Sequence, residues 1–71
     1  MARKITEKEQ AKWEAKGVER AQQLIDAGYT FEQVGYVMVN RGFAYQVKDG
    51  ALELRVWNDF PRSRVIATFA A

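Results

Sequence analysis

Residues 43–56 decide the fold and read FAYQVKDGALELRV. Apolar and polar residues alternate on both sides of Asp49-Gly50, a dipeptide that favours a two-residue type I′ turn. A two-residue loop pairs Lys48 with Ala51, and the other pairs follow along both strands. The predicted hairpin then has one apolar face, formed by Phe43, Tyr45, Val47, Leu52, Leu54 and Val56. Its other face pairs Gln46 with Glu53 and Ala44 with Arg55, and a slip of one residue would exchange the two faces.

A long amphipathic helix is predicted over Glu7–Ala27. Apolar or small residues recur there at steps of three and four, which places them on one face. Thr6 and Glu9 have the spacing of a capping box at its start. Gly28 follows where a left-handed C-cap is expected.

A second, shorter helix is predicted from Phe31 to about Arg41, ending at Gly42. Thr30 and Gln33 form another capping box. Most of its residues are apolar, as in a helix that is covered on more than one side. We therefore expect it to lie between the first helix and a sheet, with Gly35 letting the two helices approach closely.

A third strand is predicted over residues 64–70. Its alternation puts Val65, Ala67 and Phe69 on one side and Ile66, Thr68 and Ala70 on the other. The sequence thus predicts an α+β fold in which a helical hairpin packs on one face of a three-stranded antiparallel β-meander (ααβββ). With 71 residues the chain is one small domain, 1–71. Residues 1–5 lack periodicity and are expected to be mobile.

The composition argues against catalysis. The chain contains no cysteine and no histidine, which removes thiolate chemistry, disulfides and the usual proton shuttle. The acidic residues are scattered, so we expect no metal site and no cofactor. A small domain also has little room for a substrate cavity beside its core. We expect a non-enzymatic protein.

The sequence carries no signal for membranes or secretion. No window approaches the ~18 apolar residues of a membrane span. The N-terminal residues lead into a charged stretch rather than an apolar one, unlike a secretory signal. We therefore expect a cytoplasmic protein with no membrane partner.

The strongest indication of function is Trp57, which the hairpin register points away from the core. The net positive charge of the chain also lies in the half that contains Trp57, because residues 36–71 hold five basic and three acidic residues. Tryptophan and arginine are enriched at binding hot spots. We therefore predict that the outer sheet face and the 58–64 loop dock on a protein partner, with Ile66 near them on one register of the third strand. The candidate partner-binding residues are Trp57, Arg55, Gln46, Lys48, Phe60, Arg62 and Arg64. The structural alternative is that Trp57 folds over the sheet edge and Phe60 closes the end of the core.

The type of protein that this suggests is a small regulator or inhibitor. In size, basic pI and lack of catalytic side chains, the chain resembles the small proteins with which bacteriophages and mobile elements block host machinery. No motif carries that resemblance. Free edge strands would also permit a homodimer or strand addition to another protein.

Nucleic acid is the alternative partner. Cationic residues recur every four positions along the first helix, at Lys8, Lys12, Lys16 and Arg20, and a phosphate backbone would relieve their mutual repulsion. Arg55, Arg62 and Arg64 offer a second basic patch. Residues 18–57 also resemble a winged helix-turn-helix, with Gly28 in the turn and the Asp49-Gly50 hairpin as the wing. That resemblance implies DNA binding through the second helix, whose first turns offer Thr30, Glu32, Gln33 and Tyr36 where DNA readers use Arg, Lys, Asn or Gln.

Overall fold

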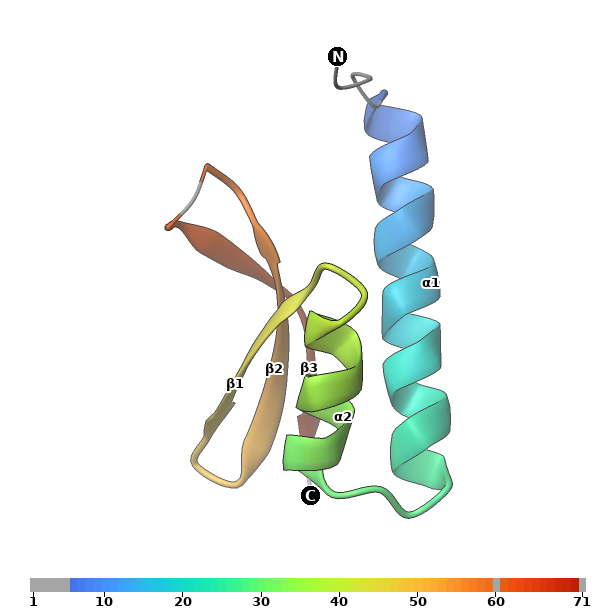
Figure 1. Ribbon diagram of the computed structural model, residues 1–71, viewed down its shortest axis with the longest axis vertical. Coiled ribbons are helices and arrows are strands. Elements are labelled where there is room, and N and C mark those ends of the chain that lie inside the picture. Colours follow the sequence, from blue (N-terminus) through green and yellow to red (C-terminus); the bar gives the residue numbers. More distant parts are fainter. Residues whose placement is uncertain (1–5, 60, 71) are drawn as a thin grey trace.

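The computed structural model describes residues 6–59 and 61–70, in which two helices precede a three-stranded sheet. All strand pairs are antiparallel, in the order β1-β2-β3. Both helices lie against the sheet (Figure 1), which confirms the predicted α+β arrangement. The elements are α1 (Glu7–Asp26), α2 (Phe31–Val39), β1 (Ala44–Lys48), β2 (Ala51–Trp57) and β3 (Ser63–Ala70). The predicted mobility of residues 1–5 lies outside the described residues.

Local hydrogen bonds fix where each helix begins. The Thr6 hydroxyl accepts from the backbone N–H of Glu9 at 3.1 Å, and the Thr30 hydroxyl accepts from that of Gln33 at 3.2 Å. Both capping boxes are complete, as predicted. The second helix is shorter than predicted, because α2 ends at Val39 and residues 40–42 form a turn.

The hairpin has the predicted register. Asp49 and Gly50 both have positive φ, 54° and 76°, as a type I′ turn requires. The observed pairs run from Ala44 with Arg55 to Lys48 with Ala51. The helix-facing residues of β2 form the centre of the core, with Leu52, Leu54 and Val56 all at most 1% exposed. Val47, near the turn, keeps 39% of its surface exposed, so the apolar face is not covered along its full length.

A β-bulge interrupts the pairing of β2 with β3. Leu54 pairs with Ala67, but the next residue, Arg55, pairs with Val65, so Ile66 is the extra residue. An extra residue exchanges the faces of everything beyond it. Val65 therefore lies opposite Arg55 on the outer face, and the prediction that it shares a side with Ala67 and Phe69 is wrong. Ile66 packs against the core instead of joining the outer face.

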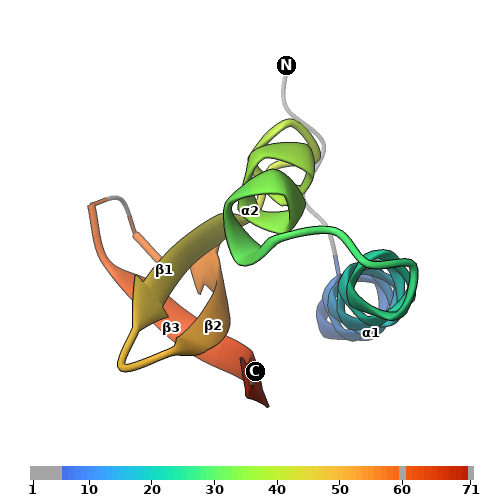
Figure 2. The ribbon, with the colours of Figure 1, turned by 90° about the horizontal axis from the view of Figure 1, so that it is seen from below.

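The two helices share the inner face of the sheet. Helix α2 contacts β1 and β2, whereas α1 contacts both α2 and β3. Figure 2 shows them side by side over the sheet. The expectation that α2 separates α1 from the sheet is therefore wrong. Gly35 also has a different role from the predicted one, because a side chain there would collide with the ring of Tyr45 in β1 rather than with α1.

Candidate functional site

Trp57 is the last residue of β2, where β1 no longer accompanies it. Extending the β1–β2 register by two pairs puts Gly42 across from Trp57, and glycine has no side chain to fill that position. Trp57 lines a hollow of about 360 Å³ with Gln10, Trp13 and Gly42, which we call the tryptophan hollow. It is still 47% exposed. The indole thus lies at the sheet edge toward the helices, and it is only partly covered.

Trp13 reaches the same hollow from α1. Its ring stacks on Phe43, with centroids 4.0 Å apart and planes 13° from parallel. A methyl group at Gly42 would lie 3.5 Å from Cζ2 of Trp13, so this glycine borders the Trp13 ring and adds no side chain to the hollow. Trp13 is fixed by its stack, whereas Trp57 presents about half of its surface to solvent.

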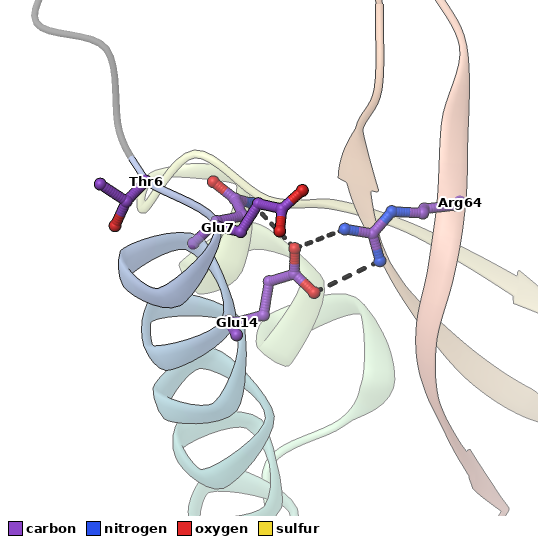
Figure 3. A pocket seen from close by; sticks show the side chains of 6 residues that line it. Thr6, Glu7, Glu14 and Arg64 are labelled. Carbon is purple, nitrogen blue, oxygen red and sulfur yellow. Dashed lines mark hydrogen bonds and ion pairs between the residues drawn. The ribbon is translucent and has the colours of Figure 1, made fainter.

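A second hollow adjoins the first and shares Gln10 with it. It also measures about 360 Å³ and is lined by Thr6, Glu7, Gln10, Ala11, Glu14 and Arg64. Figure 3 shows Arg64 extending from β3 toward Glu14 on α1. Arg64 donates from Nη2 to Oε2 of Glu14 at 2.6 Å and from Nη1 to Oε1 at 3.3 Å. The amide of Gln10 donates to the same Oε2 at 2.8 Å.

These contacts change the acidity of Glu14. The hydrogen bond from Arg64 holds the pKa of Glu14 below its usual value, although burial of the carboxyl opposes this change. The Gln10 hydrogen bond and the positive charge of Arg64 lower the pKa further. Glu14 is therefore ionised at neutral pH and ties α1 to β3 beside the tryptophan hollow.

The predicted partner-binding residues do not form a single patch. Gln46, Lys48 and Arg62 are exposed. Arg55 is engaged on the outer face, where it donates to Glu53 Oε1 at 2.9 Å and to the hydroxyl and carbonyl oxygens of Ser63. Arg64 lies on the opposite side, because the bulge puts it across from Val56 and toward α1. Phe60 lies outside the described residues.

Of the residues that line the two hollows, only Trp57 and Arg64 are predicted from sequence as binding residues; Gln10, Trp13, Glu14 and Gly42 are among those that are not. From sequence, Trp13 is simply one of the apolar residues on the inner face of the first helix, and Gln10 and Glu14 are ordinary polar residues of that helix. One signal was present, since Gly17 stands one turn after Trp13 inside a long helix, where glycine is unfavourable. The structure shows why: the ring of Phe43 fills the space beside Gly17.

The cationic row is exposed along α1, at Lys8, Lys12, Lys16 and Arg20. Four residues cover slightly more than one helical turn, so the row drifts around the helix by about 40° per step. Its last two members reach a third hollow, of about 140 Å³, which is lined by Trp13, Lys16, Gly17, Arg20, Arg41 and Phe43. The fold thus adds Arg41 to the predicted row.

The helices do not have the arrangement of a helix-turn-helix. Helices α1 and α2 run side by side in opposite directions (Figures 1 and 2). The helices of a helix-turn-helix instead meet at roughly 90–120°. The structure therefore gives no support to the winged helix-turn-helix resemblance over residues 18–57.

The described residues contain neither a cluster of metal ligands nor a membrane-spanning helix. Among residues 6–59 and 61–70, no three or more acidic side chains gather into a group that could hold a metal ion. Within the same residues, neither helix has the length and apolar character to cross a bilayer. Comparison of the chain with known protein families, curated proteins and solved structures found no match.

Proposed function

We propose that this chain is a small non-enzymatic docking module that binds a protein partner through the tryptophan hollow. One observation carries the proposal: two tryptophans from α1 and β2 line one open hollow, and Trp57 keeps 47% of its surface exposed. Tryptophan is among the residues most enriched at the hot spots of protein interfaces.

The surroundings of the hollow suit such an interface. A domain of this size buries only about 60% of its unfolded surface, so it has few large apolar side chains to spare. Polar groups border the exposed indole: Gln10 lines the hollow itself, and the Glu14–Arg64 pair adjoins it. An apolar centre with a polar rim is the anatomy of a protein interface. The partner would insert an apolar side chain between the indoles and place hydrogen-bonding groups opposite Gln10.

The proposal moves the docking surface away from the one predicted from sequence. Trp57 remains its centre, but Trp13, Gln10 and Gly42 replace most of the outer sheet face. A module of this kind acts by occupying the surface of its partner, as a regulator or inhibitor does. The absence of histidine and cysteine from the chain supports a role without catalysis.

The test compares Trp57→Ala with Tyr36→Ala. Tyr36 is a matched control, because it is an aromatic residue that is 72% exposed on α2 and lines neither hollow. The wild-type chain is used to capture its partner from a lysate of its source cells, and the purified partner is then titrated calorimetrically with each variant. We expect Trp57→Ala to abolish binding and Tyr36→Ala to retain it. Equal affinity of wild type and Trp57→Ala would refute docking at the tryptophan hollow.

A further inference from the structure

We propose that the third hollow binds a phosphate of a single-stranded nucleic acid, whose backbone then follows the cationic row of α1. This inference does not depend on the protein-docking function. The hollow is lined by Lys16 and Arg20 from α1, Arg41 from the turn after α2, and the residues Trp13, Gly17 and Phe43. We call it the cation hollow.

Positive charge gathers at the cation hollow, and no carboxylate of the described residues forms an ion pair with it. Three of its lining residues are cationic and none is acidic. Among the described residues, no carboxylate forms a salt bridge with Lys16, Arg20 or Arg41, whereas Arg55 and Arg64 each bind a glutamate. Arg20 makes one long side-chain hydrogen bond, at 3.4 Å, to Gln23. An anion of the solvent or of a partner is therefore the natural counterpart of this hollow.

Its size and chemistry suit a phosphate group. Arginine presents a planar set of donors that binds phosphate oxygens in pairs, and two arginines face this hollow. A volume of about 140 Å³ admits a small anionic group but not a bulky ligand. The rest of its lining is Gly17, which has no side chain, and the stacked rings of Trp13 and Phe43.

The row along α1 extends the site beyond a single phosphate. Lys12 and Lys8 continue it toward the helix start, at intervals of about 6 Å along the axis. Lys12, Lys16 and Trp13 line an adjoining hollow of about 340 Å³, to which Glu9 adds a carboxylate. Trp13 therefore stands between two groups of cations. Basic grooves with interleaved aromatic side chains are typical of proteins that bind single strands, because bases stack on the aromatic rings.

The first test is fluorescence anisotropy with a labelled random-sequence DNA strand of about 20 nucleotides, at about 50 and 200 mM salt. Arg41→Gln is compared with Lys48→Gln, which removes one exposed positive charge from the far end of the hairpin. We expect Arg41→Gln to weaken binding several-fold and to lower the salt slope by about one, as the loss of one phosphate contact does. Lys48→Gln should leave both nearly unchanged. Equal losses in the two variants, or no binding at the lower salt, would overturn the proposal.

The second test separates a nucleic acid from other polyanions. The chain has two tryptophans, so Trp57→Phe leaves Trp13 as the only indole. We expect the single strand to quench Trp13 fluorescence and poly-L-glutamate of the same total charge to bind more weakly, without quenching. Equally tight binding of poly-L-glutamate that also depends on Arg41 would assign the cation hollow to an acidic protein instead. Tighter binding of the duplex than of the single strand would likewise overturn the assignment. Circular dichroism of each variant confirms that it is folded.

Discussion

The ring of Phe43 occupies the space that a side chain at residue 17 would need. Phe43 follows the turn after α2, and Gly17 lies in the middle of α1, so this contact joins the two halves of the chain. The ring also stacks on Trp13, with the two centroids 4.0 Å apart. Phe43 therefore contacts both a glycine and a tryptophan of the same helix, and the hollows that Trp13 lines depend on that arrangement.

Gly17→Ala should destabilise the protein, even though alanine favours helix more than glycine by about 1 kcal/mol. The new methyl group would overlap the confined ring, and overpacking of this kind costs about 1–3 kcal/mol. The control is Gly35→Ala, where the neighbouring ring belongs to Tyr45, a half-buried residue of edge strand β1 that can shift. Urea unfolding should show the larger loss for Gly17→Ala. A more stable Gly17→Ala variant would show that Phe43 is not confined.

Glu14→Gln should change how stability depends on pH. The pKa of Glu14 is lowered in the folded protein, chiefly by the hydrogen bond from Arg64. Its carboxylate therefore stabilises the fold above the pKa of an unfolded glutamate, about 4.3, and this contribution is lost as pH falls through the folded pKa. Because Arg64 is about half exposed, the pair should contribute only about 0.5–1 kcal/mol at pH 7.

The measurement is the free energy of unfolding of wild type, Glu14→Gln, Arg64→Gln and the double variant, at pH 7 and near pH 3. We expect the two single changes to be non-additive at pH 7, with a coupling that shrinks at the lower pH. Additive effects at pH 7 would contradict a direct interaction between the two side chains in solution.

The hairpin could be predicted from sequence because a single local signal specified it. Asp49-Gly50 sets the turn, and a two-residue turn leaves one register that gathers the apolar residues on one face. The capping boxes at Thr6 and Thr30 are local in the same sense. Each of these features depends on residues that are close together in the chain, so their side chains alone determine the geometry.

The bulge at Ile66 could not be predicted in this way. Residues 64–70 are apolar or small at most positions, so their alternation does not show where an extra residue enters the strand. The position of the bulge decides whether Arg64 faces the outer side or α1, and hence whether it can reach Glu14. The same limit applies to Trp57, whose neighbours Trp13 and Gly42 come from elements far away in sequence. The prediction identified Trp57 as a candidate but not the hollow that it lines.

Gly50→Ala should destabilise the hairpin. The backbone of Gly50 has φ of 76°, a region that costs other residues about 1–2 kcal/mol, although the space around it is open. Asp49→Asn is the control, since asparagine is equally suited to the first position of a type I′ turn. We expect thermal unfolding to show a lower midpoint for Gly50→Ala and little change for Asp49→Asn. Equal midpoints for both variants would argue against a type I′ turn in solution.

Trp57→Ala should lower the stability only modestly, which separates its role in binding from a role in the core. About half of the indole surface is exposed, so truncation to alanine removes fewer packing contacts than it would at a buried tryptophan. We therefore expect the free energy of unfolding to fall by about 1–2 kcal/mol. Leu54→Ala provides the comparison, because Leu54 is fully buried and such changes cost about 2–5 kcal/mol. Urea unfolding followed by far-UV circular dichroism measures both variants, and Trp57→Phe shows how much of the loss depends on the size of the ring.

A loss for Trp57→Ala as large as that for Leu54→Ala would make Trp57 a core residue that folds over the sheet edge. Any loss of partner binding would then follow from unfolding, and the tryptophan hollow would no longer be a candidate interface.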